Sequence, residues 1–106
     1  MEIDFSHRKQ QSYYESSKEL VKKYGPKQAS KIIQRINELQ SAESLAEIKK
    51  LPQTNLHSLH SNFEGCFAVN LLHPYRMILL PIGECNLSDL STIKKVRIME
   101  IYYDYH

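Results

Sequence analysis

The chain has 106 residues, 42% of them hydrophobic and 25% charged, and its formal net charge is +2. These values are typical of an ordinary globular protein, so we expect a single domain over residues 1–106 with one modest core. No apolar run approaches the roughly 20 residues that span a bilayer, and the acidic start is unlike a signal peptide, so we expect a cytoplasmic protein that binds no membrane.

The first half of the chain predicts a strand followed by helices. Residues 2–5 alternate polar and apolar side chains, as a short strand does. Residues 9–24 predict one helix, which Gly25 and Pro26 end. Pro26 suits the first turn of a second helix, because the N–H that proline lacks would be unpaired there.

The second helix has the clearest periodicity in the chain, with apolar residues at helical spacing and polar residues expected to face outward. The apolar positions are Ala29, Ile32, Ile33, Ile36 and Leu39. The positions expected to face outward are Lys27, Lys31, Gln34, Arg35 and Glu38. Ser41 is expected to cap a short third helix that carries Leu45 and Ile48.

The second half of the chain predicts strands. Three runs, residues 66–72, 75–82 and 95–103, are rich in strand-forming residues and are joined by polar links. Strands that follow one another in this way pair as an antiparallel meander. With the short N-terminal strand and two to three helices packed on one face, they predict a small antiparallel sheet in an α+β fold. Two cysteines, Cys66 and Cys85, make no disulfide framework and indicate free thiols in a reducing compartment.

The predicted helices are basic. The segment from Arg8 to Arg35 holds eight basic residues against two acidic ones, with tyrosines among them. Such a stretch suits a polyanion such as RNA, through phosphate contacts and release of counterions. The lysines taken as RNA contacts are Lys22, Lys23, Lys27 and Lys31. The solvated face of amphipathic helices is the alternative interpretation.

Two histidines, His57 and His60, lie three residues apart before the strands. Zinc is one alternative for this spacing, but no pair of cysteines, no second pair of histidines and no carboxylate at ligand spacing accompanies them, so we expect no metal and no other cofactor. Loop histidines lying over the sheet, anchored by Leu56 and Leu59, are the better interpretation.

Arg76 opens a predicted strand and is followed by four apolar residues. A guanidinium in so apolar a strand needs a partner, since an unpaired buried charge is costly. The partner is either a carboxylate of a neighbouring strand, Asp104 or Glu100, or a phosphate held by two parallel N–H bonds.

The sequence closes with Asp104-Tyr105-His106, which is either an ordinary polar tail or the end of a strand with Asp104 and His106 on one face. Cleavage of RNA needs removal of the 2′-OH proton, protonation of the leaving 5′-oxygen and stabilisation of charge on phosphorus. Histidine carries protons near neutral pH, a carboxylate orients it or shares that work, and arginine stabilises the charge. Tyr75 or Tyr105 could stack on a base.

Taken in order, these motifs resemble the HigB branch of the RelE/ParE toxin superfamily, the toxins of bacterial type II toxin–antitoxin modules. The matching motifs are Leu51-Pro52, Leu56-His57-Ser58-Leu59, Gly65-Cys66-Phe67-Ala68-Val69, Pro74-Tyr75-Arg76 and the terminal Asp104-Tyr105-His106. The resemblance implies a RelE-like fold and a ribosome-dependent mRNA endoribonuclease (an mRNA interferase), which cuts mRNA without a metal, by means of its 2′-OH, and so inhibits translation. The implied partners are the ribosome with its 16S rRNA, mRNA and a neutralising helix-turn-helix antitoxin (HigA-like).

Site residues follow from the resemblance by matching position. The resemblance implies that His57 and His106, with Asp104, transfer protons. It also implies that Arg76 stabilises the phosphate and that Tyr105 positions the RNA. His60 would add an RNA contact, although many relatives have a lysine there, and Glu64 stands where a basic or polar residue is common. An extra aromatic residue before Asp104 predicts a bulge or a slipped register in the last strand.

Two other functions remain open from the sequence. One is a non-catalytic inhibitor of a topoisomerase, as in the ParE branch, whose members lack residues for proton transfer. The other is a degenerate relative that only binds an antitoxin or RNA, an alternative that His60 and Glu64 keep open.

Overall fold

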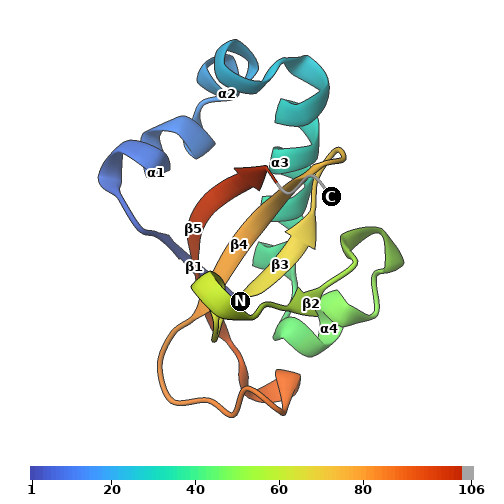
Figure 1. Cartoon of the computed structure of the whole chain (residues 1–106). Coiled ribbons are helices and arrows are strands. Elements are labelled where there is room, and N and C mark those ends of the chain that lie inside the picture. The colour runs from blue at the N-terminus through green and yellow to red at the C-terminus, as the bar shows by residue number, and fades with distance from the viewer. Residues whose placement is uncertain (104–106) are drawn as a thin grey trace.

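The computed structural model describes residues 1–103 and shows helices packed against a small sheet (Figure 1). The helices and strands in chain order are β1 (Glu2–Phe5), α1 (Arg8–Glu15), α2 (Ser17–Tyr24), α3 (Pro26–Ser41), α4 (Leu45–Lys49), β2 (His57–Ser58), β3 (Phe67–Asn70), β4 (Tyr75–Pro81) and β5 (Lys95–Tyr103). Short 3₁₀ helices lie at Pro52–Thr54, Ser61–Phe63 and Leu90–Thr92. The predicted α+β class is confirmed. Within the described chain, no helix is both long enough and apolar enough to cross a bilayer.

The described strands form one sheet in the order β1-β5-β4-β3-β2. The predicted meander is confirmed, because β3, β4 and β5 are antiparallel neighbours. The expectation of a wholly antiparallel sheet is wrong at β1, which runs parallel to β5 with Ile3 opposite Val96. A parallel pair requires a long crossover, and here all four helices and three strands lie between the two partners in the chain. No local sequence pattern reveals the direction of so distant a pairing.

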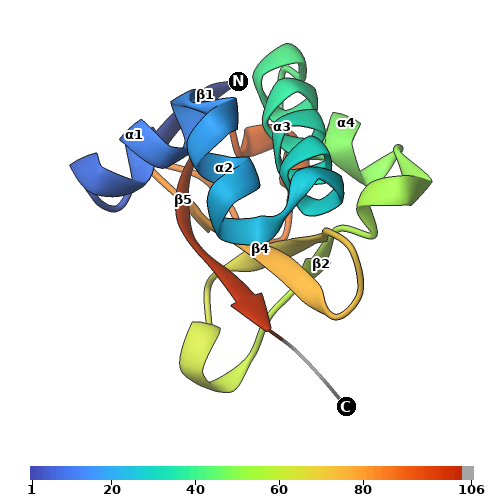
Figure 2. The same ribbon diagram turned by 90° about the horizontal axis from the view of Figure 1, so that it is seen from above.

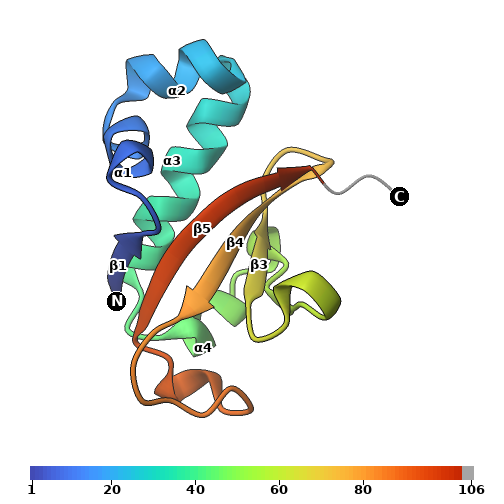
Figure 3. The same ribbon diagram turned by 60° about the vertical axis from the view of Figure 1, so that its left-hand side comes forward.

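The two faces of the sheet are covered differently. Helices α1, α2 and α3 lie on one side, which we call the helix face, and the short 3₁₀ helix after β2 lies on the other, the open face (Figures 2 and 3). The main core joins α3 to strand residues of the helix face, which include Val69, Met77, Leu79, Val96 and Ile98. The open face carries a much smaller cluster, in which Cys66, Ala68 and Ile78 are buried.

Helix α3 confirms its predicted apolar stripe but not all of its polar face. Ala29, Ile32, Ile36 and Leu39 are buried as expected, whereas Ile33 is only partly buried. Arg35, expected to face outward, is 3% exposed. Its guanidinium donates from Nε to the Asn70 carbonyl at 2.7 Å and from Nη2 to the Gln53 carbonyl at 2.8 Å. Arg35 therefore ties α3 to β3 and to the loop before β2, and it belongs to the core.

The single helix expected over residues 9–24 is two helices that meet at Ser16. Ser16 has an extended backbone, and its hydroxyl accepts a hydrogen bond from the Glu19 N–H at 3.3 Å. A serine followed three residues later by glutamate is the sequence signature of a helix N-terminus, which explains why a new helix begins here. Ser41 does not cap the next helix, because α3 extends through it and Ser44 is the N-cap residue of α4.

Strand β5 has a bulge at Met99 and not at the extra aromatic residue, where an irregularity was predicted. Leu79 pairs with Ile98 and Ile78 pairs with Glu100, so Met99 has no opposite residue and forms a bulge. Its carbonyl accepts hydrogen bonds from Gln10 Nε2 at 2.8 Å and from the Ser6 hydroxyl at 3.0 Å. Beyond the bulge the pairing is regular through the end of β5, where Tyr103 lies opposite Tyr75.

Candidate active site on the open face of the sheet

The strand register places a row of residues across the open face. His57 of β2 lies opposite Ala68, Ala68 opposite Ile78, and Ile78 opposite Glu100. Residues directly opposite one another in neighbouring strands have their side chains on the same face of the sheet. Arg76 lies two residues before Ile78, so strand alternation puts it on this face as well. The open face therefore gathers an imidazole, a guanidinium and a carboxylate around an apolar floor.

His57 and Arg76 contact each other directly. Arg76 Nη1 lies 2.9 Å from His57 Nε2, and both side chains are partly buried. The other ring nitrogen, His57 Nδ1, lies 2.7 Å from the carbonyl oxygen of Asn55. A carbonyl only accepts and a guanidinium only donates, so these two contacts assign the proton to Nδ1 and the lone pair to Nε2. The lone pair of His57 thus points at the cation of Arg76.

Asn55 holds this arrangement and was missed by sequence reasoning. Its backbone is left-handed, with φ 45° and ψ 48°, and it ends the 3₁₀ turn that begins at Pro52. Asparagine adopts this conformation more readily than most residues with a side chain, so an asparagine shortly after Pro52 is a signal that could have been used. The turn directs the Asn55 carbonyl toward the imidazole two residues later.

His57 and Arg76, which we call the pair, have the components of a site for phosphate chemistry. A neutral imidazole with an available lone pair can accept a proton, and an adjacent guanidinium can stabilise an anion. In the structure these two groups contact one another through Arg76 Nη1 and His57 Nε2. An anionic ligand that takes the guanidinium of Arg76 would release His57 Nε2 to accept a proton from that ligand.

The three terminal residues predicted to complete the site, Asp104, Tyr105 and His106, lie outside the described residues. The strand that leads to them is described, and it pairs Tyr102 with Arg76 and Tyr103 with Tyr75. The described backbone of β5 thus ends beside the strand end that carries Arg76.

The predicted RNA contacts lie apart from the pair. Tyr75 precedes Arg76 in β4 and packs against the main core on the helix face, so the two side chains point to opposite faces. His60 is exposed and precedes the 3₁₀ turn Ser61–Phe63. The lysines are on the helices of the other layer: Lys22 and Lys23 in the last turn of α2, and Lys27 and Lys31 on α3.

One contact brings the lysine-bearing helix to the same end of the sheet as Arg76. Gln28 of α3 is 6% exposed, accepts a hydrogen bond from the Leu72 N–H at 2.9 Å and donates to the Leu72 carbonyl at 3.4 Å. Leu72 belongs to the turn that joins β3 to β4, just before Arg76. Lys27 and Lys31 therefore flank the residue that fixes the turn beside the site.

The open face is hollowed next to the row. A hollow of about 470 Å³ is bounded by the start of α1, the segment 62–64 and strand β5, with Cys66 and Met99 in its lining. Two carboxylates, Glu64 and Glu100, also line it. Burial raises the pKa of the Cys66 thiol, which therefore stays protonated at neutral pH.

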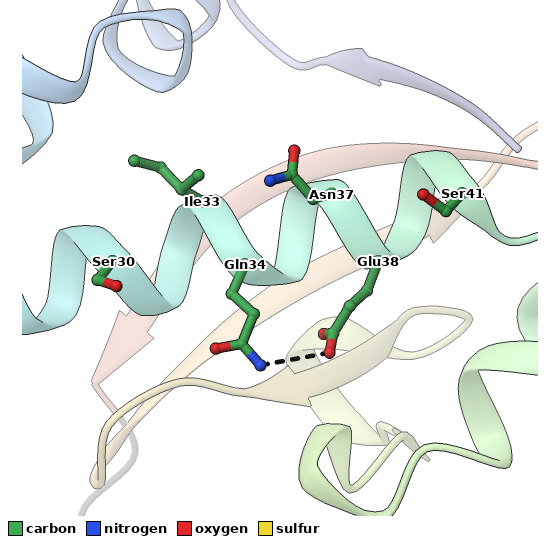
Figure 4. A pocket seen from close by; sticks show the side chains of 6 residues that line it. All are labelled: Ser30, Ile33, Gln34, Asn37, Glu38 and Ser41. Carbon is green, nitrogen blue, oxygen red and sulfur yellow. Dashed lines mark hydrogen bonds between the residues drawn. The ribbon is translucent and has the colours of Figure 1, made fainter.

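A second hollow, of about 460 Å³, lies on the outer side of α3 (Figure 4). Its lining is mainly hydroxyl and amide side chains, with one carboxylate, that of Glu38. This carboxylate is held by Arg35 Nη1 at 2.9 Å, Gln53 Nε2 at 2.9 Å and Gln34 Nε2 at 3.4 Å. No histidine of the described chain lines this hollow, and its one carboxylate is already held by three hydrogen-bond donors, so the open face is the better candidate.

No group of three histidine, cysteine or acidic side chains that could hold a metal ion occurs among residues 1–103. No protein-family model matches the chain, and neither curated proteins nor solved structures give a match. Function is therefore argued from the chemistry of the open face.

Proposed function

We propose that this protein is the toxin of a bacterial type II toxin–antitoxin pair, a metal-independent endoribonuclease of the HigB type that acts in the cytoplasm on mRNA bound to the ribosome. The observation that carries the proposal is the 2.9 Å contact between His57 Nε2 and Arg76 Nη1 on the open face. The resemblance named these two residues from sequence motifs 19 positions apart, and an unrelated constraint, the register of three strands, brings them together.

The proposed reaction uses the ribose as its own nucleophile. The scissile phosphate takes the guanidinium of Arg76, and His57 Nε2 accepts the proton of the 2′-OH. The 2′-oxygen forms a bond to phosphorus, the bond to the 5′-oxygen breaks, and the leaving oxygen receives a proton. The products are a 2′,3′-cyclic phosphate and a 5′-hydroxyl. The resemblance gives the proton donor as His106 with Asp104, and Tyr105 as the residue that positions the RNA.

The basic helices supply the proposed contact with the ribosome. Lys22, Lys23 and Lys27 are exposed near the junction of α2 and α3, at the end of the sheet that carries Arg76. Phosphates of 16S rRNA would bind this surface while mRNA enters the open face. The proposed antitoxin partner is a helix-turn-helix protein.

Cleavage of mRNA on programmed ribosomes tests this proposal. Arg76→Ala removes the guanidinium that is proposed to stabilise charge on the phosphate, and His57→Gln removes the proposed base. Each variant is expected to lower the cleavage rate about 10²–10³-fold. Arg97→Ala is the matched control, because Arg97 is a partly exposed arginine that pairs with Asp4 and lies outside the His57–Arg76 pair. This control is expected to retain cleavage within about tenfold.

Three results would contradict the proposal. Unchanged cleavage by well-folded Arg76→Ala and His57→Gln proteins would remove the pair from the mechanism. Cleavage of naked RNA at the rate seen on ribosomes would contradict dependence on the ribosome. Arrest of DNA replication before protein synthesis in expressing cells would favour the topoisomerase inhibitor instead.

A further inference from the structure

A pocket of about 200 Å³ lies where α1 and α2 meet the edge of β5, away from the His57–Arg76 pair. Three tyrosines and two opposite charges line it: Tyr13, Tyr14, Tyr24, Lys23 and Glu100. We propose that this pocket binds an unpaired guanine base of RNA. The inference rests on the proposed RNA binding and adds a base-specific contact that the cleavage chemistry does not require.

The aromatic walls of the pocket face a common space. The ammonium of Lys23 lies 4.7 Å from the centre of the Tyr13 ring and 5.4 Å from the centre of the Tyr24 ring. One cation close to both rings means that both rings are turned toward the volume it occupies. A planar base can enter that volume and stack on a ring when the flexible lysine swings aside, since Lys23 is exposed.

The third tyrosine fixes the back of the pocket. Tyr14 is 8% exposed, and its ring stacks on Phe5 with 5.4 Å between the ring centres. Burial raises the pKa of its phenol, and the nearby Tyr24 and the Glu100 carboxylate raise it further. Tyr14 is therefore a neutral, immobile wall, and Glu100 is the charged group near it.

The charges select guanine among the four bases. Guanine is the base that offers two adjacent donors, N1–H and the N2 amino group, which match the two oxygens of one carboxylate such as Glu100. Its O6 and N7 acceptors on the neighbouring edge suit the ammonium of Lys23. Adenine lacks the paired donors, and uracil and cytosine each offer donors at one position.

The pocket shares two lining residues with the hollow on the open face. Glu100 and Gln10 line both this pocket and the hollow of about 470 Å³ next to the row. The nitrogen and the oxygen of the Gln10 side-chain amide are both hydrogen-bonded: Nε2 donates to the Met99 carbonyl, and Oε1 accepts from the Ser6 hydroxyl. Gln10 is thus a fixed rim, and an RNA strand lying over the open face could turn one base past it into the pocket.

Binding of short single-stranded RNA to the full-length protein tests this inference. Fluorescently labelled hexauridine with one central G, A or C is titrated at fixed salt, and binding is followed by anisotropy. The G oligonucleotide is expected to bind about tenfold more tightly than the A oligonucleotide. Glu100→Gln is expected to bring the two within about threefold, because an amide offers a donor where guanine needs an acceptor.

Matched variants separate this contact from general charge and from folding. Glu84→Gln removes the same charge from an exposed loop and is expected to keep the preference for G. Tyr24→Leu, with circular dichroism as a check of the fold, is expected to weaken binding of the G oligonucleotide about tenfold. Equal affinity of the wild-type protein for G and A, or a preference for G that survives Glu100→Gln, would overturn the inference.

Two further measurements are needed. One distinguishes RNA from a free nucleotide as the ligand, and the other distinguishes failure of the guanine pocket from failure of the proposed nuclease. Displacement of the G oligonucleotide by guanosine monophosphate at an equal concentration would assign the pocket to a free nucleotide and overturn RNA as its ligand. A protein that cleaves mRNA on ribosomes but shows no preference for G overturns the guanine pocket alone. A protein that prefers G but cleaves nothing overturns the nuclease alone.

Discussion

The two faces of strand β4 carry side chains with different roles, because successive residues of a strand point to opposite faces. On the helix face, Met77 and Leu79 are completely buried against the main core. On the open face, Arg76 contacts His57, and Leu80 packs only partly against a small cluster. One face supplies the burial that stabilises the fold, and this leaves the other free to carry charged groups, since a strand changes face at every residue.

The two faces also differ in what an arginine does. Beside the helix face, Arg35 is buried and donates to two backbone carbonyls that are distant in sequence. On the open face, Arg97 of β5 donates to the Asp4 carboxylate at 2.8 Å. The exposed fraction is 38% for the Arg97 side chain and 35% for the Asp4 side chain. The first arginine is itself buried and joins separate segments of the chain, whereas the second forms a partly exposed ion pair that water screens.

Adjacent leucines on opposite faces give the sharpest test of this difference. Leu79→Ala is expected to lower the free energy of unfolding by about 2–5 kcal/mol, because it opens a cavity under α3. Leu80→Ala is expected to cost only about 1–2 kcal/mol, since Leu80 is already partly in water. Urea denaturation of the two variants measures both values. Equal losses would show that the open face is packed as tightly as the helix face.

Arg35 gives the next largest expected effect. Arg35→Leu leaves the partly buried carbonyls of Asn70 and Gln53 without the buried donor of Arg35, which is expected to cost about 1–3 kcal/mol of unfolding free energy. Arg35→Lys is expected to recover only part of this loss, because one ammonium cannot reproduce the guanidinium fork. Lys27→Leu, an exposed cation on the same helix, is the control, with an expected change within about 0.5 kcal/mol. A stable Arg35→Leu protein with weakened RNA binding would show that Arg35 acts in RNA binding rather than in the core.

These features show which parts of the molecule local sequence could predict. The stripe of α3 and the meander follow from periodicity, which operates over a few residues. The break at Ser16 also has a local signal, the serine followed three residues later by Glu19. The placement of Tyr75 away from Arg76 also follows from strand alternation.

Other features depend on pairing over long distances in the chain. The burial of Arg35 depends on a carbonyl 35 residues away, and the direction of β1 depends on a strand at the other end of the chain. The resemblance placed His57 and Arg76 in one site, but their direct contact depends on the β2–β3–β4 register and on the left-handed backbone of Asn55. Local pattern contains none of this information.

The ion pair on the open face gives the smallest expected effect and a pH dependence with a defined sign. The hydrogen bond from Arg97 is the main cause that lowers the pKa of the Asp4 carboxyl below its ordinary value of 3.8. A carboxyl whose pKa is lower in the folded state stabilises the fold above its unfolded pKa, and this contribution disappears as the pH falls through the folded pKa. Asp4→Asn is therefore expected to be slightly less stable than the wild-type protein at neutral pH.

This small difference should vanish in acid and in concentrated salt, since the pair is exposed and screened. The measurement is the denaturation midpoint of wild type and Asp4→Asn from neutral pH to below 3.8, with Glu84→Gln as an exposed carboxyl control. A difference that persisted below the folded pKa of Asp4 would mean that the side chain acts through packing rather than charge. In that case the open face around β1 and β5 would contribute to the core after all, and the contrast between the two faces would be limited to the strands β2, β3 and β4.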